Sequence, residues 1–514
     1  MLASDLPLTY NAIHILEHNL ADRAGKTALY SLERNLTFQE VHDEANRVGN
    51  ALKRLGVRTG EYVGLLALDG PEWVACFFGT LKIGAIHVGM NTLLTPAEYD
   101  YMLNDSRMRV LIVHEKVFPA IQPILGEQKY LKDVIVIGNA PAPYPTYEDW
   151  VHGESDQLEG APTHREDIAT LNYSSGTTGE PKGIPHAHKD LALTAELWGR
   201  QVLGLTEADR TFAGAKLFFT FGTGGNLLFP WYVGASCVLF SGSPRVAANL
   251  LDMVNRFKPT IFFNSPTGFA MAMALDGFKE KYDLSSVRLC VSAGEALPEP
   301  IWHEWKKQTG LDIIDGIGST EVYHIFISNR PDDIKPGTSG KPVPGYEVRL
   351  VDENFADVPQ GEIGNLLVRG ESVALSYLHQ YERSRKTFLG EWLFTGDKYV
   401  VDADGYYTHA GRSDDMLKVG GIWVSPMEVE AALTRHPAVL QCAVVGKTDE
   451  SDLIKPKAFV ILNEGYAASA EMEQDLIEFC RANMAGYKRP RWIEFMTELP
   501  FTATGKIQRF KLRA

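Results

Sequence analysis

The chain has 514 residues, a formal net charge of −15 and 45% hydrophobic residues, among them 24 Phe, 20 Tyr and 9 Trp. This apolar content excludes a disordered chain and is sufficient for a large core. The acidic balance disfavours a nucleic-acid-binding protein, because an acidic chain repels phosphodiester backbones. The five cysteines form no CxxC pair, so they indicate neither a disulfide framework nor a zinc site and are typical of a reducing cytoplasm.

The N-terminus shows no basic segment followed by an unbroken apolar run, so we predict no signal peptide. The most apolar stretch, residues 73–90, includes Lys82, His87 and three glycines. A buried helix followed by a strand explains it better than a membrane span, which requires about 20 apolar residues. We therefore expect a cytoplasmic protein without a membrane partner.

From the N-terminus, helical and strand patterns alternate. Apolar residues recur at helical spacing over residues 36–57 and 71–85. Short apolar runs predict strands at residues 62–70, 86–91, 109–115, 134–139 and 237–240. Such alternation predicts an α/β fold with layered, largely parallel sheets.

The pattern changes near Tyr346. Turns separate strand patterns that predict a small, mostly antiparallel β-region at residues 346–353, 362–370 and 405–411. The C-terminal part predicts a β–β–α–β unit, with strands at 439–447, 456–463 and 491–496 and a helix at 471–485. The polar stretch 411–415 is the predicted boundary between a large N-terminal α/β domain, 1–413, and a small, mobile C-terminal α+β domain, 414–514.

The strongest local signal is YSSGTTGEPKG, residues 173–183, which follows the apolar segment IATLN. Glycines let the backbone bend so that N–H groups converge, and hydroxyls and a lysine add donors, so the loop is suited to hold a polyphosphate. It is not a Walker A loop, because Pro181 takes the place of that motif's second glycine. The alternative is a plain surface loop, in which a lysine and a preceding strand are unusual. The candidate contacts are Ser174, Ser175, Gly176, Thr177, Thr178, Gly179 and Lys182.

Three further segments are weak signals when taken singly. DGIGSTE, residues 315–321, ends in a carboxylate suited to Mg²⁺, which takes one or two protein carboxylates plus phosphate oxygens. FTGD, residues 394–397, places an aspartate at a tight turn where it can accept from ribose hydroxyls, and GRSDDMLKVGG, residues 411–421, supplies Arg412 to the same sugar. The alternatives are a solvated turn glutamate and a structural salt bridge.

The C-terminal segment is basic. Residues 500–514 contain four basic and no acidic side chains. A solvated basic tail is the plain alternative. Gly505 instead presents Lys506 in a turn, which indicates a lysine placed for a specific role.

Together, these five segments resemble the acyl-adenylate-forming superfamily of acyl-CoA synthetases, luciferases and peptide-synthetase adenylation domains. The resemblance extends over nearly the whole chain, with the motifs in the family's order. Four segments are similar to the benzoate-type aryl-CoA ligases in particular: KLFFTFGTGGN (216–226), SAGEALP (292–298), DGIGSTEVYHIFISN (315–329) and MLKVGGIWVSP (416–426).

The resemblance implies two half-reactions. An aromatic acid and MgATP give acyl-AMP and pyrophosphate, and the sulfur of coenzyme A then attacks to give the aryl thioester and AMP. The implied catalytic residues are Lys506, which bridges the substrate carboxylate and the α-phosphate, Thr320, which contacts the α-phosphate, and Glu321, which ligates Mg²⁺. The phosphate loop holds the β- and γ-phosphates. The other implied nucleotide contacts are Asp397 and Arg412 at the ribose, Gly294, Glu295 and Ala296 at the adenine, and Asp315 and Gly316.

The resemblance also implies an acid pocket lined by Thr220, Phe221, His324 and Ile325. Benzoate ligases often carry Ala-Tyr in place of Thr220-Phe221, which leaves the acid open among benzoate, hydroxybenzoates, aminobenzoate and cyclohexanecarboxylate. For the second step, family members rotate the small domain about a hinge, here Asp414, which withdraws Lys506. The glycine pair Gly420 and Gly421 then leaves room for the pantetheine arm.

Three other functions remain open on the sequence. A stand-alone adenylation enzyme would load a carrier protein, a kinase or ATPase would release ADP, and a nucleotide sensor would release no product. Lys506 and Glu321 argue against the sensor. We expect ATP, Mg²⁺ and coenzyme A as cofactors, an aryl carboxylate as the small-molecule partner, no nucleic acid partner, and a monomer or a homodimer.

Overall fold

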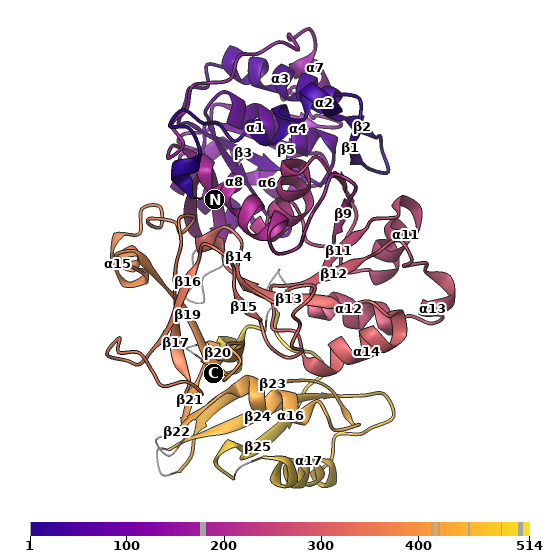
Figure 1. Cartoon of the computed structure of the whole chain (residues 1–514), viewed down its shortest axis with the longest axis vertical. Helices are drawn as coiled ribbons and strands as arrows, with labels where there is room; N and C mark the ends of the chain where they lie inside the picture. Colours follow the sequence, from indigo (N-terminus) through magenta and orange to yellow (C-terminus); the bar gives the residue numbers. More distant parts are fainter. Residues whose placement is uncertain are drawn as a thin grey trace. The chain divides into compact units, whose positions relative to one another are not determined.

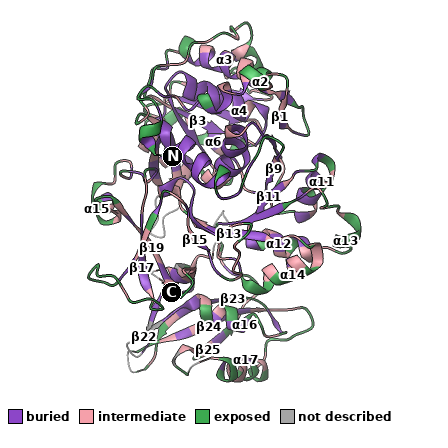
Figure 2. Ribbon diagram, in the orientation of Figure 1, coloured by how far each residue is buried: buried purple, intermediate pink, exposed green. Residues whose placement is uncertain are grey.

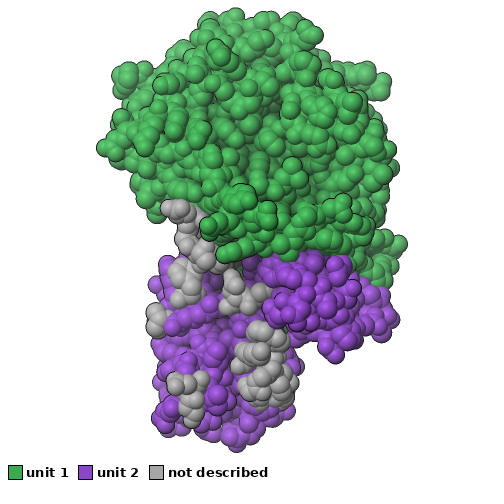
Figure 3. Space-filling view, turned by 90° about the vertical axis from the view of Figure 1, so that its left-hand side faces the viewer, with its two compact units in different colours: residues 1–348, 368–393 green, residues 349–367, 394–514 purple. Residues whose placement is uncertain are grey.

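The computed structural model describes residues 2–174, 181–412, 415–419, 422–450, 453–484, 486–501 and 507–513. The chain divides into two compact units (Figure 3). The first is formed by Met1–Val348 and Val368–Leu393, and the second by Arg349–Leu367 and Phe394–Ala514. The division expected from the sequence, at residue 413, lies within the second unit. Residues 413 and 414 fall outside the described ranges, so the hinge at Asp414 stays a prediction.

A six-stranded sheet of the first unit contains the strand that leads into the predicted phosphate loop (Figure 1). Its order is β6-β5-β3-β4-β7-β8, and all neighbours are parallel except the last pair. The strands are β3 (Tyr62–Leu66), β4 (Ile86–Gly89), β5 (Val110–His114), β6 (Asp133–Ile137), β7 (Ile168–Ser174) and β8 (Lys182–Ala187). The predicted strand before the phosphate loop is therefore confirmed, and it ends at Ser174.

A nine-stranded sheet of the same unit carries the second predicted nucleotide segment. Its order is β15-β14-β13-β12-β11-β9-β10-β1-β2, parallel from β13 to β1 and antiparallel at both ends. The strands are β1 (Thr27–Tyr30), β2 (Leu36–Thr37), β9 (Arg210–Ala213), β10 (Ser236–Val238), β11 (Ile261–Asn264), β12 (Leu289–Ser292), β13 (Ile313–Gly318), β14 (Ile325–Ser328) and β15 (Lys341–Pro342). The layered, largely parallel α/β architecture is confirmed.

Local signals in the sequence set the ends of the long helices. α3, Phe38–Arg54, begins after Thr37, whose side chain accepts from the backbone N–H of Glu40. α4, Pro71–Lys82, has proline in its first turn and is buried along almost its whole length, as the purple ribbon of Figure 2 shows. The other α-helices of this unit are α1 (His14–Glu17), α2 (Leu20–Arg23), α5 (Pro96–Asp105), α6 (Phe118–Ile121), α7 (Tyr147–Val151), α8 (His188–Thr194), α9 (Thr220–Thr223), α10 (Phe229–Tyr232), α11 (Ala247–Phe257), α12 (Pro266–Met273), α13 (Phe278–Lys281), α14 (Glu299–Thr309) and α15 (Tyr381–Thr387).

Short helical turns complete the first unit. Two are π-helical, η3 (Ala195–Arg200) after α8 and η4 (Gly224–Leu228) after α9. Three are 3₁₀ turns, η1 (Ala3–Asp5), η2 (Gln122–Glu127) and η5 (Thr320–Val322). η5 connects β13 to β14, so the predicted catalytic residues Thr320 and Glu321 lie between two paired strands.

The small β-region and the C-terminal fold follow the prediction. A five-stranded sheet has the order β16-β17-β19-β18 with β20 paired to β19, formed by β16 (Glu347–Val351), β17 (Gly364–Arg369), β18 (Phe388–Leu389), β19 (Trp392–Val401) and β20 (Tyr407–Arg412). The β–β–α–β unit consists of β23 (Val439–Thr448), β24 (Ile454–Leu462), α17 (Ala470–Asn483) and β25 (Trp492–Phe495). The hairpin β21 (Leu417–Val419) and β22 (Ile422–Val424), α16 (Pro426–Leu433) and the turns η6 (Gly486–Lys488) and η7 (Arg509–Leu512) complete the second unit.

Two exclusions drawn from the sequence can be compared with the fold. Within the described ranges, no helix is both long and apolar enough to cross a membrane. The apolar stretch 73–90 forms α4 and β4, as predicted. All five cysteines are free and buried, which agrees with the absence of a predicted disulfide framework.

Candidate active site

The ends of the predicted phosphate loop are held by a strand pair. β7 ends at Ser174 and β8 begins at Lys182, and these two residues face each other in the antiparallel register. Among the described residues, the buried hydroxyl oxygen of Ser174 has no hydrogen-bond partner. The predicted contacts Ser175, Gly176, Thr177, Thr178 and Gly179 lie outside the described residues.

The structure brings Lys182 and Glu321 together, although they are far apart in the sequence. The Lys182 ammonium lies 2.9 Å from Glu321 Oε1, and 14% and 13% of the two side chains are exposed. Tyr377 joins them: its hydroxyl donates to Glu321 Oε1 at 2.9 Å and accepts from Lys182 Nζ at 3.4 Å. Burial opposes the charge on Glu321, but Lys182 and the Tyr377 hydroxyl hold the pKa of this carboxyl below its ordinary value. Glu321 is therefore an ionised carboxylate at neutral pH.

The segment around Asp315 continues the strand before the turn. The motif at residues 315–321 indicates a transition from the apolar strand before it to a loop, and β13 continues to Gly318 before it ends. Its first half pairs in parallel with β12, and its second half pairs antiparallel with β14, because the chain turns back through η5 and supplies a new partner. Gly316 packs against Ile325, since a Cβ at Gly316 would stand 3.0 Å from that side chain. The predicted contacts Asp315 and Gly316 thus lie in a strand, and only Thr320 and Glu321 occupy the turn.

The predicted adenine segment follows the neighbouring strand. Gly294, Glu295 and Ala296 come directly after β12, whose last residue, Ser292, is paired with Asp315. Asp315 is buried, and its Oδ1 has no hydrogen-bond partner among the described residues. Burial raises the pKa of Asp315 from its ordinary value of 3.8 to about 8. The carboxyl is therefore neutral at pH 7 in the folded chain.

Asp315→Asn is expected to remove a pH-dependent cost of folding. The folded chain holds the Asp315 proton up to about pH 8, whereas the unfolded chain releases it near its ordinary pKa of 3.8. The free energy of unfolding of the wild type therefore falls as pH rises through this window, and asparagine does not titrate. We expect the melting temperature of the variant, relative to wild type, to increase by about 2 °C or more between about pH 5 and about pH 8. A difference that is independent of pH would contradict the neutral carboxyl.

An aromatic cluster surrounds His324, which is separated from η5 by one residue, Tyr323. The ring centroid of His324 lies 5.7 Å from Phe221, 4.8 Å from Trp198 and 4.5 Å from Phe229. The backbone of Gly224 closes against this cluster, since a Cβ there would stand 2.5 Å from His324 Cδ2. The predicted pair Phe221 and His324 is therefore in contact.

The other two predicted acid-pocket residues are placed by the flanking elements. Thr220 is half-buried at the first position of α9. Ile325 is buried at the start of β14 and packs on Gly316. Phe218 is buried, whereas its neighbour Phe219 is half-buried and forms a T-shaped ring pair with it.

His324 is a neutral histidine in an apolar environment. Burial lowers the pKa of His324 to about 3, so the ring carries no charge at neutral pH. Its Nε2 lies 3.5 Å from the carbonyl oxygen of Phe221, and its buried Nδ1 has no partner among the described residues. A carbonyl only accepts, so this contact places the proton on Nε2 and leaves Nδ1 as a hydrogen-bond acceptor.

In the second unit, Asp397 and Arg412, which the sequence predicts to hold the ribose, form a salt bridge with each other. They are opposite each other in the register of β19 and β20, with Arg412 Nη1 3.0 Å from Asp397 Oδ2. His409 Nε2 lies 3.3 Å from Asp397 Oδ1. Burial raises the pKa of Asp397, but Arg412 and the hydrogen bond with His409 outweigh it and hold the pKa below its ordinary value. Asp397 is therefore a carboxylate that can accept from two hydroxyls.

The tight turn predicted for residues 394–397 is wrong. These residues lie inside the ten-residue strand β19. The turn signal came from Gly396, which has φ 76°, a value that glycine adopts without strain. The strand pairs with β18 before this glycine and with β20 from Asp397 onward, and the β20 register shifts between Lys398 and Tyr399.

Sequence reasoning missed five residues that contact the predicted site residues. They are Tyr377 at the Lys182–Glu321 pair, Trp198 and Phe229 around His324, His409 at Asp397, and His186 beneath η5. His409 belongs to the quoted strand 405–411, so its proximity to Arg412 was a usable signal. The other four depend on contacts between distant parts of the chain. The predicted residues Asp414, Gly420, Gly421 and Lys506 lie outside the described residues.

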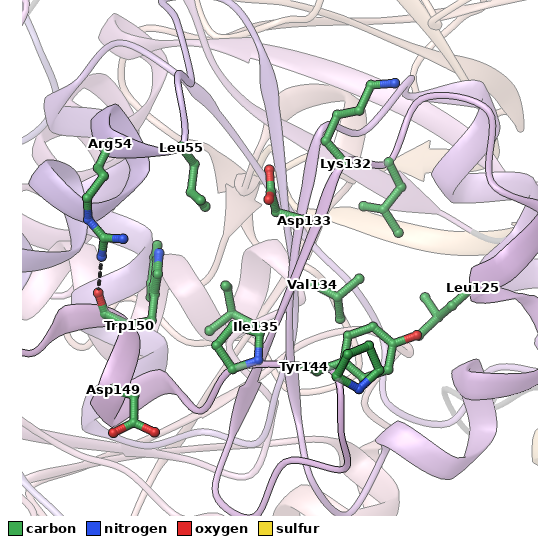
Figure 4. Close-up of a pocket in the computed structure, with 13 residues that line it drawn as sticks. Arg54, Leu55, Leu125, Lys132, Asp133, Val134, Ile135, Tyr144, Asp149 and Trp150 are labelled. Atoms are coloured by element: carbon green, nitrogen blue, oxygen red, sulfur yellow. Dashed lines mark hydrogen bonds between the residues drawn. The ribbon is translucent and has the colours of Figure 1, made fainter.

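Two further observations concern possible metal ligands and a pocket outside the predicted active site. Within the described residues, no group of three or more His, Cys, Asp or Glu side chains is arranged to hold a metal ion. A pocket of about 450 Å³ beside β6 is lined by Arg54, Tyr144 and Trp150, and Figure 4 shows the Arg54 guanidinium donating to the Trp150 carbonyl. None of the described residues that we predict for the active site lines this pocket.

Comparison with known proteins gives the family. The model of the AMP-binding enzyme family matches residues 16–378, and that of the AMP-binding enzyme C-terminal domain matches residues 428–506. The chain therefore belongs to the AMP-binding enzyme family, the acyl-adenylate-forming superfamily that its motifs indicate.

Individual relatives indicate to which branch of the family the chain belongs. The benzoate–CoA ligase of Thauera aromatica is 46% identical, with 100% of this chain and 97% of that protein covered. The 4-hydroxybenzoate–CoA/benzoate–CoA ligase of Rhodopseudomonas palustris is 41% identical, with coverage of 98% and 94%. A structure of an anthranilate CoA ligase in complex with anthranoyl-AMP is 65% identical with a TM-score of 0.95, covering 100% of this chain and 98% of that one. Within the family, the chain thus belongs to the aryl-CoA ligase branch.

Proposed function

We propose that this chain activates an aromatic carboxylate with ATP as acyl-AMP, releases pyrophosphate, and transfers the acyl group to coenzyme A. The observation that carries the proposal is the position of the aromatic cluster. Neutral His324, enclosed by aromatic rings, comes three residues after Glu321, the ionised carboxylate paired with Lys182. A surface for an aromatic ring and a group suited to a nucleotide therefore lie on one short segment of the chain.

The charged pair supports the nucleotide part of the proposal. Lys182 holds the β- and γ-phosphates together with the phosphate loop, and Thr320 contacts the α-phosphate. The single carboxylate of Glu321 fits Mg²⁺, which takes one or two protein carboxylates and completes its octahedron with phosphate oxygens and water. When bound, Mg²⁺ would neutralise charge on the polyphosphate. Lys182 balances the charge of the Glu321 carboxylate in this structure, and Glu321 would be the protein ligand of the ion.

The remaining roles extend the family resemblance to this chain's residues. Asp397 and Arg412 hold the ribose, because the ionised carboxylate accepts hydrogen bonds from hydroxyls and the guanidinium donates to them. Gly294, Glu295 and Ala296 flank the adenine. Lys506 bridges the two reacting anions in the first step. Rotation about Asp414 then withdraws it, and the backbone at Gly420 and Gly421 admits the pantetheine arm. The free cysteines support action in a reducing compartment, the cytoplasm.

For the acid, we infer a benzoate that carries a hydrogen-bond donor on the ring, and anthranilate fits this description. His324 Nδ1 is a buried acceptor without a partner among the described residues, and an aromatic amine is a donor. The 65% identical protein of known structure is an anthranilate ligase. An unsatisfied buried acceptor favours the acid that satisfies it over benzoate, because leaving it unpaired costs binding energy.

The test is ATP–pyrophosphate exchange with anthranilate, benzoate, the hydroxybenzoates and cyclohexanecarboxylate, followed by thioester formation with free coenzyme A. We expect exchange with the aryl acids, the highest kcat/KM for anthranilate and a stoichiometric thioester. Exchange with medium or long fatty acids alone would contradict the aryl assignment. Exchange without thioester would indicate an adenylation enzyme that loads a carrier protein.

A further inference from the structure

In the turn η5, Thr320–Val322, each carbonyl oxygen accepts a hydrogen bond from a residue outside the turn. In chain order, these oxygens accept from His186 Nε2 at 2.6 Å, from Ala374 N at 2.8 Å and from Ser372 Oγ at 2.8 Å. The first of these donors acts on the Thr320 carbonyl, which also accepts from the backbone N–H of Tyr323 at 3.0 Å within the turn. The His186 donor comes from β8, the strand that begins at Lys182 and closes the phosphate loop.

The backbone after the turn is strained. Tyr323 has φ 72° and ψ −44°, a conformation that a bulky side chain rarely adopts. Its buried ring packs edge-on against His186, with the ring centroids 5.1 Å apart. Strain of this kind persists only where the surroundings fix the backbone. His186 supplies two of these constraints, a hydrogen bond before the strained residue and a ring contact with it.

A second buried group orients the His186 ring. His186 Nδ1 lies 3.0 Å from Asp190 Oδ2, and 0% and 4% of the two side chains are exposed. The Lys189 ammonium is 2.7 Å from the other carboxylate oxygen of Asp190. A carboxylate and a carbonyl both accept, so the two ring nitrogens each donate, one to Asp190 and one to Thr320. The ring has no freedom to flip or tilt, and the direction of Nε2–H is fixed.

We propose that His186, oriented by Asp190, is a positioning residue for the nucleotide-binding turn. Its Nε2–H holds the Thr320 carbonyl and thereby aims the Thr320 hydroxyl and the Glu321 carboxylate. This inference rests on the proposed function, because it takes η5 as the turn that contacts the α-phosphate. The alternative is a structural role alone, since the Asp190 carboxylate also accepts from the backbone N–H of Ala187 before α8.

Two amide variants separate these roles. The side-chain nitrogen of glutamine reaches the place of Nε2, and that of asparagine reaches the place of Nδ1. His186→Gln therefore keeps the donor to Thr320 and loses the one to Asp190, whereas His186→Asn does the reverse. Each variant loses one hydrogen bond of His186. If His186 had a structural role alone, the two variants would therefore change stability and AMP binding to a similar extent. His188→Asn is the matched control, because His188 is an equally buried neighbour that accepts from Ala12 N.

The readouts are the affinity for AMP by calorimetry, the steady-state constants of pyrophosphate exchange and the melting temperature. AMP carries the α-phosphate and requires no acid substrate. We expect His186→Asn to bind AMP about 10-fold more weakly and to lose about 10- to 100-fold in kcat/KM, the range for a hydrogen bond made by a charged group. His186→Gln and His188→Asn should stay within about threefold of wild type, and the melting temperatures of the two His186 variants should agree.

Equal losses in the two His186 variants, or losses that follow the melting temperature, would overturn the inference. If His186→Asn does not fold, His186→Gln alone decides, since a folded glutamine variant that binds AMP 10-fold more weakly contradicts positioning through Nε2. Failure of the proposed function gives a different result. In that case the wild type binds AMP, and the His186 variants still separate, but no aryl acid supports exchange.

Discussion

Glu321→Gln is expected to lower kcat/KM for acid-dependent ATP–pyrophosphate exchange by about 100-fold or more, the range for removing one preorganised electrostatic contact. The ionised Glu321 carboxylate is held 2.9 Å from both the Lys182 ammonium and the Tyr377 hydroxyl. Glutamine keeps the shape and the contact with Tyr377 but loses the charge. Glutamine therefore removes the anionic oxygen that Mg²⁺ requires. It also leaves the largely buried Lys182 ammonium without its counter-ion.

The Glu321→Gln variant should also change the Mg²⁺ requirement of the enzyme, which a single activity measurement does not report. The Mg²⁺ concentration that gives half-maximal exchange should rise, because the ion loses its only proposed protein carboxylate. Glu299→Gln is the matched control, since Glu299 is exposed on α14, with 61% of its side chain accessible, and pairs only with His303 among the described ion pairs. A Glu321→Gln enzyme within about threefold of wild type, with an unchanged Mg²⁺ requirement, would show that Glu321 is not the ligand.

Lys506→Ala is expected to separate the two half-reactions. Acyl-AMP formation brings two anions together, and a lysine between them stabilises the charge as it moves from carboxylate to phosphate. Loss of this contact should reduce exchange by about 100-fold or more. Thioester formation from preformed aryl-AMP and coenzyme A should stay within about threefold of wild type, because Lys506 is proposed to be withdrawn in that step.

Lys511→Ala serves as the control in this experiment, because Lys511 is an exposed lysine of the same C-terminal segment, in η7. It should leave both half-reactions unchanged. Equal losses of both half-reactions in Lys506→Ala would contradict the rotation of the small domain. Full activity in the first half-reaction would contradict the catalytic assignment itself.

The sequence predicts those parts of the fold that depend on residues close together in the chain. The helix α3 follows from the helical spacing of apolar residues over 36–57, and β7 follows from the apolar segment before the predicted phosphate loop. Asp397 and Arg412 face each other within one sheet, which agrees with the salt bridge that the sequence offered as the alternative, and their role at the ribose stays a prediction. These features depend on neighbours along the chain or on a pattern that the family shares.

The features that sequence reasoning missed depend on distant neighbours. Tyr377 is 56 residues from Glu321, and His186 is 134 residues from Thr320. Neither has a local signal, because a tyrosine in a loop and a histidine in a strand have many ordinary roles. The mistaken turn at Gly396 also depends on distant neighbours, since β19 pairs with β18 before this glycine and with β20 directly after it, and the strand continues through a residue that favours a turn.

The most direct test of the central claim is the product balance of a single reaction with ATP, coenzyme A and the aryl acid that supports the fastest exchange. The account predicts AMP, pyrophosphate and aryl-CoA in equal amounts, with none formed when the acid is left out. Release of ADP, or AMP and pyrophosphate without any aryl-CoA, would contradict it.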